Sequence, residues 1–66
     1  MTVTLWTRDK KFEAQVFRIF GRPWHIHIFR HHSRYKRQVS RAMTAWPLSA
    51  AIAKARYQMR KLRDGK

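Results

Sequence analysis

The side chains of this 66-residue chain best able to do chemistry are its four histidines, three of which stand at odd-numbered positions of one short segment. His25, His27 and His31 would share one face of a strand. Alternate histidines can ligate a metal ion, but these three span about 20 Å, which is too long for one ion. The chain has no cysteine, and the neighbouring Arg18 and Arg30 would repel a cation. We therefore expect no metal and no other cofactor, and interpret the imidazoles as part of a polar sheet face that can stack on bases or donate to phosphate.

Catalysis has little support beyond these histidines. The sequence lacks a Gly-rich phosphate loop, a pair of carboxylates and a cysteine nucleophile. Neither Ser33 nor Ser40 has an acid that would orient a histidine toward it. A metal-independent ribonuclease that uses His and Lys stays an alternative, but the sequence favours a binding protein over an enzyme.

The distribution of charge is the strongest functional signal. The chain has 16 Lys and Arg against three Asp and Glu, which gives a net charge of +13. The acids are Asp9, Glu13 and Asp64, so the long span between the last two holds many cations and no carboxylate. Unpaired cations repel one another, and a polyanionic partner would relieve that repulsion. A merely solubilising surface is the alternative, but mixed signs or acids serve solubility better.

The densest charge lies in a basic run from 30 to 41, in which Tyr35 stands among Lys, Arg and His residues. Cations interleaved with an aromatic ring are expected where a nucleic-acid backbone is gripped and a base is covered. A charged loop without a target is the alternative. The predicted interface consists of Arg18, Arg22, His25, His27, Phe29, Arg30, Arg34, Lys36, Arg37 and Arg41. Its Lys and Arg residues would hold phosphate, whereas its two histidines and Phe29 would face bases.

Strands are expected in the first part of the chain. Alternation and β-branched residues predict strands at 2–7, 12–20 and 24–31. The segment 35–43 reads as a fourth strand or as a short helix, and we favour the strand. The sequence thus predicts an antiparallel sheet of three or four strands.

A helix is expected at the end of the chain. Leu48, Ile52, Ala55, Met59 and Leu62 form one apolar stripe. That stripe predicts an amphipathic helix over 47–63, with Pro47 in its first turn. The helix would pack across the sheet, which makes the chain one small α+β domain over 1–66.

The hairpin between the second and third strands can be given a register. Gly21-Arg22 predicts a two-residue loop, which places Phe17 opposite Ile26 on the core face and Glu13 opposite Arg30 at its end. Three tryptophans are present, and we expect all of them in the core. The hairpin is then a two-stranded ribbon of the kind that fits the major groove of DNA.

The predicted layout, a sheet followed by one helix, is similar in architecture to small sheet-reading DNA-binding domains such as plant AP2-type domains and integrase arm-binding domains. No motif carries this similarity, which adds only slightly to the expectation of nucleic-acid binding. DNA is favoured slightly over RNA.

The leading hypothesis is a small nucleic-acid-binding protein with a regulatory or accessory role. A rival is an effector of the kind found in viruses and mobile elements, which binds a larger host nucleic-acid-handling enzyme and inhibits or redirects it. A component of a ribonucleoprotein is a third reading. The apolar runs are too short to span a membrane, and the first residues lack a secretory signal, so we expect a cytoplasmic, nucleic-acid-associated protein. A homodimer through an edge strand or through Phe29 stays open.

Overall fold

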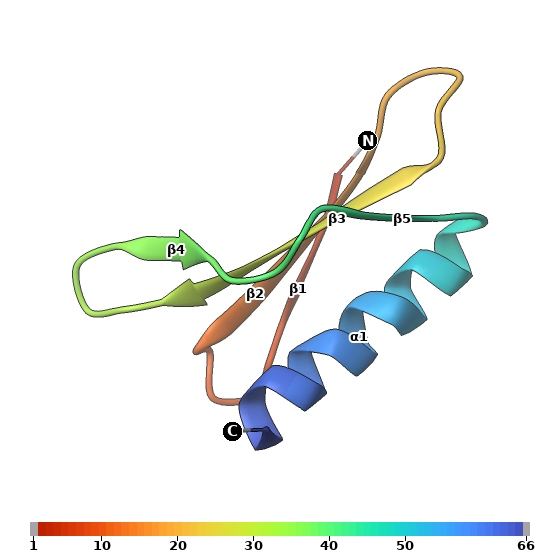
Figure 1. Cartoon of the computed structure of the whole chain (residues 1–66). Coiled ribbons are helices and arrows are strands. Elements are labelled where there is room, and N and C mark those ends of the chain that lie inside the picture. Colours follow the sequence, from red (N-terminus) through yellow and green to blue (C-terminus); the bar gives the residue numbers. More distant parts are fainter. Residues whose placement is uncertain (1, 66) are drawn as a thin grey trace.

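The computed structural model describes residues 2–65 and shows a five-stranded sheet with one helix on one of its faces (Figure 1). The strands are β1 (Thr2–Trp6), β2 (Phe12–Arg18), β3 (Trp24–His31), β4 (Lys36–Gln38) and β5 (Met43–Ala45), and the helix is α1 (Leu48–Asp64). All strand pairs are antiparallel, in the order β1-β2-β3-β4, and β5 shares with β4 the edge of β3 that β2 leaves free. The predicted α+β class is confirmed.

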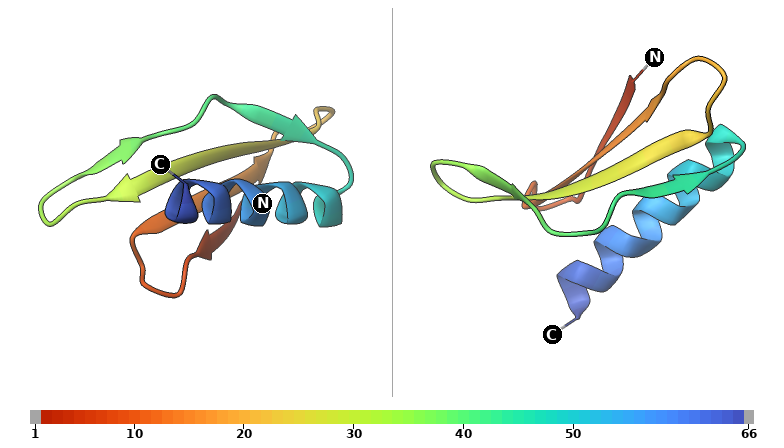
Figure 2. Two further views of the ribbon diagram at one scale, coloured as in Figure 1. Left: turned by 60° about the horizontal axis from the view of Figure 1, so that its bottom comes forward. Right: turned by 45° about the horizontal axis from the view of Figure 1, so that its top comes forward.

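The helix α1 packs against β2, β3 and β5 and leaves the opposite face of the sheet uncovered (Figure 2). It begins and ends one residue later than predicted, and Pro47 stands at its N-cap. The expected apolar stripe is present, with Ala51, Ala55 and Met59 buried against the sheet. Within residues 2–65 there is no helix long and apolar enough to cross a membrane.

The core lies between α1 and the two central strands. Val16, Ile26 and Ile28 are fully buried there, and each such aliphatic side chain contributes about 1.5–3 kcal/mol when it leaves water. Ala14 is also fully buried, as are two alanines of α1. Small residues on both sides allow the helix to lie close to β2.

The predicted register of the β2–β3 hairpin is wrong by one residue. Val16 pairs with Ile26 and Ala14 with Ile28, so Phe17 faces away from the helix and pairs with His25. The strand β2 ends at Arg18, and the loop that follows, 19–23, is longer than the predicted two residues. Glu13 pairs with Phe29 in place of Arg30. Burial of the small aliphatic face of β2 beneath α1 thus outweighs the turn preference on which the prediction relied.

The ambiguous segment 35–43 is neither one strand nor a helix. β4 and β5 lie at its two ends, and both pair with β3. Phe29 pairs with Gln38 and Ile26 pairs with Met43. The segment from Gln38 to Met43 is therefore two residues longer than the part of β3 that it faces, and the two extra residues form a bulge. Bulges of this kind redirect side chains at the edge of a sheet.

Only one of the three tryptophans is a core residue. Trp24 is buried, whereas Trp6 is 42% exposed and Trp46 is 58% exposed. The prediction was wrong for these two because β1 is an edge strand and Trp46 lies in the turn that leads into α1.

Candidate nucleic-acid interface

The structure distributes the ten predicted interface residues over three surfaces and one loop. On the sheet face opposite α1, which we call the open face, lie His25, His27, Phe29 and Lys36. On the helix side of the sheet, at the β3–β4 end, lie Arg30, Arg37 and Arg41. At the β2–β3 turn lie Arg18 and Arg22, and Arg34 stands exposed in the β3–β4 loop.

Arginines from three segments meet on the helix side of the sheet. Arg30, Arg37 and Arg41 line a shallow hollow of about 580 Å³. An adjoining hollow of about 630 Å³ shares Arg30 and adds Lys61 from α1. We call the surface formed by these four cations the arginine groove; no Asp or Glu lines either hollow.

The strand pairing explains why these cations meet. Arg30 and Arg37 are direct cross-strand partners on β3 and β4, and like charges in that arrangement repel each other. Arg41 belongs to the two-residue bulge between β4 and β5, which carries it to the same hollow. In the described chain, residues 2–65, no carboxylate lies within ion-pair distance of any of the three arginines.

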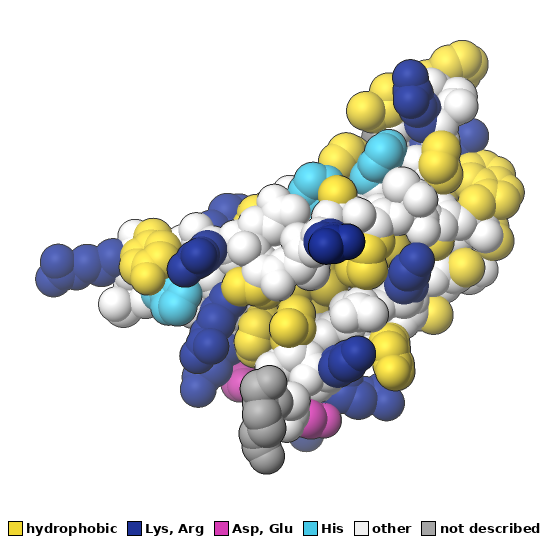
Figure 3. All heavy atoms as spheres, in the orientation of Figure 1, with side chains coloured by type: hydrophobic (Ala, Val, Ile, Leu, Met, Phe, Trp, Pro, Cys, Tyr) yellow, Lys and Arg dark blue, Asp and Glu magenta, His cyan; other side chains and the backbone are white. Residues whose placement is uncertain are grey.

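The three acids of the chain are engaged elsewhere. Asp9 accepts hydrogen bonds from the Thr7 hydroxyl at 2.6 Å and the Lys11 backbone N–H at 3.0 Å, and these bonds hold its pKa below the usual value. Asp64 pairs with the adjacent Arg63 at 3.0 Å. Figure 3 shows the result on the face that bears α1, where Lys and Arg side chains are spread over the surface and the visible carboxylates lie near the end of the helix.

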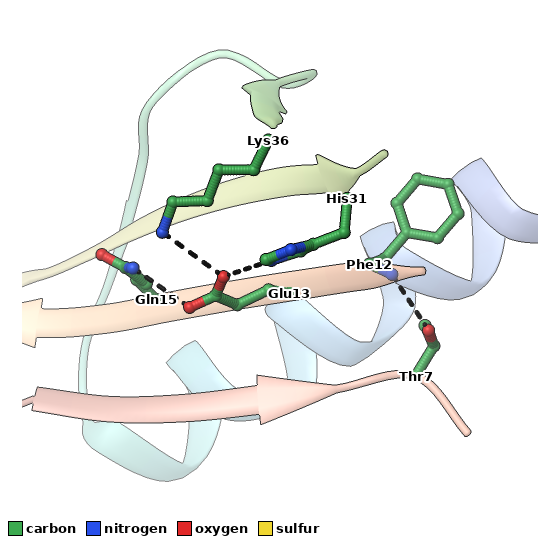
Figure 4. A network of polar contacts seen from close by, with 6 residues as sticks. All are labelled: Thr7, Phe12, Glu13, Gln15, His31 and Lys36. Carbon is green, nitrogen blue, oxygen red and sulfur yellow. Dashed lines mark hydrogen bonds and ion pairs between the residues drawn. The ribbon is translucent and has the colours of Figure 1, made fainter. Parts of the chain in front are cut away.

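Glu13, the third acid, is 6% exposed and forms the centre of a polar cluster on the open face (Figure 4). Its carboxylate lies 2.6 Å from His31 Nε2, 3.1 Å from Gln15 Nε2 and 3.6 Å from Lys36 Nζ. An ionised carboxylate only accepts, so Nε2 of His31 carries the proton in this bond. Burial alone would raise the pKa of Glu13, but the His31 and Gln15 hydrogen bonds and the Lys36 charge outweigh it and lower the pKa.

Rings from three adjacent strands cover the rest of the open face. Phe17 of β2 lies 5.4 Å from the His25 ring and 5.3 Å from the His27 ring, centroid to centroid. Phe29 carries the Lys36 ammonium 4.9 Å from its centroid. Trp6 of β1 packs 4.7 Å from the His31 ring. The open face is therefore an array of partly exposed rings that contact one another, and Nε2 of His25 is buried there without a hydrogen-bond partner in residues 2–65. Exposed rings can stack on planar ligands such as bases.

The histidines do not converge on one point. Among residues 2–65, His, Asp and Glu side chains form no group of three that could hold a metal ion. His31 is bound to Glu13, while His25 and His27 lie against Phe17. The chemistry that this arrangement offers is ring stacking and hydrogen bonding.

Comparison with protein-family models, with curated proteins and with solved structures finds no match for this chain. What the protein does must therefore be inferred from its own residues.

Three residues of the open face and the arginine groove were not predicted from the sequence. Phe17 and Trp6 were expected in the core, and the correct hairpin register would have moved Phe17 to the open face. Lys61 was not among the predicted interface residues, although its place on the helix side next to Arg30 makes it part of the groove. Its place could not be found from the helical phase, which puts Lys61 on the side of α1 away from the apolar stripe.

Proposed function

We propose that this protein binds nucleic acid, with the arginine groove on phosphates and the open face on bases. The observation that carries the proposal is the direct pairing of Arg30 with Arg37, beside Arg41, without a carboxylate partner in the described chain. Facing guanidiniums without a counter-ion cost stability. A phosphate between them would turn this cost into charge-assisted, bidentate hydrogen bonds.

The two surfaces adjoin at β4. Arg37 points to the groove side, whereas Lys36 and Gln38 belong to the open face. A backbone held in the groove would therefore run along the β4 edge beside the rings of β3. Electropositive tracks next to aromatic rings are the usual composition of surfaces that bind nucleic acid with unstacked bases.

The β2–β3 hairpin is not the free ribbon that the major-groove hypothesis needs. Both of its strands have neighbours, because β1 pairs with β2 and both β4 and β5 pair with β3. Only its loop projects from the sheet (Figure 1). The proposal therefore places phosphate contact in the groove and base contact on the open face, and leaves the hairpin loop a separate role.

Fluorescence anisotropy with labelled duplex DNA, single-stranded DNA and RNA of one sequence, titrated across salt, tests the proposal. The variant Arg30→Gln/Arg37→Gln/Arg41→Gln removes the groove charge. Arg8→Gln/Arg56→Gln/Arg60→Gln removes the same charge from the β1–β2 turn and from the side of α1 away from Lys61. Each lost phosphate contact lowers the log–log salt slope by about 0.7–0.9, so we expect the groove variant to lose about 2 units of slope and the control less than about 1.

Two results would contradict the proposal. One is an equal loss of slope in both variants, which would mean generic attraction by the net charge. The other is weak, salt-labile binding of all three nucleic acids by the wild type, which would favour the rival, a protein that docks on an acidic surface of a larger enzyme.

A further inference from the structure

Among residues 2–65, the tip of the β2–β3 hairpin carries the most exposed large apolar side chain. Phe20 is 100% exposed and Ile19 is 57% exposed. The Arg22 N–H donates to the Ile19 carbonyl at 2.9 Å, and Gly21 supplies the positive φ of 78° that closes this turn. The loop stands beyond the end of the sheet in Figure 1, so Phe20 projects from a turn that the backbone fixes.

Cations are held directly behind this tip. The Arg18 guanidinium lies 4.3 Å from the centroid of the Trp46 ring, and its Nε donates to the Arg22 carbonyl at 3.0 Å. Together with Gly21 and Pro23, these three residues line a hollow of about 310 Å³. The tip thus combines a projecting ring with two arginines, one of them oriented by contacts on two sides.

The fold does not need these apolar side chains. Ile19, Phe20 and Trp46 lie outside the core, and each exposes more than half of its surface. Apolar side chains gathered at one exposed point mark a binding site. Three partners suit such a point: a nucleic acid, an anionic membrane or a second copy of this chain.

The position of the arginine groove favours nucleic acid. The tip follows one end of the β2–β3 ladder, next to Trp24, and the groove begins at Arg30, about 20 Å away along β3. A membrane touched by the tip would leave the groove well beyond the Debye length of about 8 Å. A nucleic acid along β3 would reach both, because about 20 Å corresponds to roughly six nucleotides at 3.4 Å each.

We propose that Phe20 is a wedge that inserts between neighbouring bases of the bound nucleic acid, at a step whose stacking is weak, while Arg18 and Arg22 hold the flanking phosphates. This inference rests on the proposed nucleic-acid binding. Apolar side chains enter base steps in this way and partly unstack them. The energy needed is smallest at mismatched or unpaired positions, so the wedge selects such positions over regular duplex.

The test compares two duplexes of equal length and charge, one fully paired and one with a central mismatch, in anisotropy titrations. The variants are Phe20→Ala, Phe20→Trp as the conservative replacement, and Tyr57→Ala as the control, because Tyr57 is also an exposed ring, at 59%, but lies on α1. We expect the wild type to prefer the mismatched duplex about tenfold and Phe20→Ala to lose that preference. The salt slope should stay unchanged, since no phosphate contact is removed, and Phe20→Trp and Tyr57→Ala should behave as the wild type.

Each contrary outcome has a distinct meaning. If the wild type binds neither duplex but binds single-stranded DNA or RNA, the wedge fails and the proposed function stands; if it binds none of the three, both fail. If it binds and Phe20→Ala keeps the full preference, the wedge alone is wrong. If the wild type co-sediments with phosphatidylserine vesicles and Phe20→Ala does not, the tip is a membrane anchor. If the wild type is a dimer in analytical ultracentrifugation and Phe20→Ala is a monomer, the tip is a contact between two copies. Either result would overturn the wedge.

Discussion

The two faces of the sheet are built from alternate residues of the same strands, yet only one of them is covered by the helix. On the helix side, Val16, Ile26 and Ile28 are fully buried. On the open face, Phe17 and His27 are half-buried and no second layer covers them. Antiparallel sheets commonly pack one face and leave the other to solvent. The unusual point is that the open face carries rings where solvated polar residues are the norm, so it resembles a second apolar face without a layer to cover it.

The largest expected effect tests this difference directly. Ile28→Ala on the helix side removes a fully buried side chain and should cost about 3 kcal/mol. A chain of this size has a total stability of about 3–10 kcal/mol. The variant should therefore unfold at a much lower urea concentration than the wild type, as followed by circular dichroism.

Phe17→Ala, on the open face of the neighbouring strand, is the matched partner of that variant. It should cost about 1 kcal/mol, since it loses only the contacts with His25 and His27. Its nucleic-acid affinity should fall more than its stability. If the two variants lost equal stability, the open face would be part of the core and the comparison would fail.

Glu13 is the exception on the open face, and its replacement should have the next largest effect. Glu13→Gln keeps the shape but removes the charge that His31, Gln15 and Lys36 surround. Hydrogen bonds to a charged group contribute about 1.5–3 kcal/mol, so we expect a loss of about 1–2 kcal/mol at neutral pH.

The pH dependence of that loss has a defined sign. The folded-state pKa of Glu13 lies below the ordinary value of 4.5, so its contribution is complete above pH 4.5 and disappears as the pH falls through the lower folded-state pKa. Wild type and Glu13→Gln should therefore differ in thermal midpoint at pH 7 and converge in acid. A difference that stays constant down to low pH would show that shape, and not charge, matters at this position.

The sequence allowed the class of the fold to be predicted because its strongest periodicities are local. The alternation of 24–31 and the apolar stripe of α1 each depend on one element, and both are found in the structure. The hairpin register depends on two strands and the helix at once. It was mispredicted because Ala14 is a weak hydrophobic signal, although its small size is what the close approach of α1 requires.

The same limit applies to the candidate site. Charge alone selected Arg30, Arg37 and Arg41, but their meeting depends on the bulge between β4 and β5, which no local pattern announces. Phe20 was assigned to a strand, where it would have been half-buried, because the length of the loop follows from the register. Residue types alone therefore selected the cations of the proposed interface, while the pairing of strands decided which of them share a surface.

The smallest expected effect concerns the part of the helix side that α1 leaves uncovered. Arg37 lies on that side of β4, yet it faces the groove and Arg30 in place of the core. Removing one of two facing like charges relieves their repulsion, so Arg37→Gln should raise the stability of the free protein by about 0.2–0.5 kcal/mol. Salt screens that repulsion, so the gain in stability should shrink at high ionic strength. At low ionic strength the variant should bind nucleic acid more weakly than the wild type does. If Arg37→Gln lost both stability and affinity, Arg37 would support the fold, as the other helix-side residues do. If it gained stability and lost affinity, residues of the helix side would support folding only where α1 covers them.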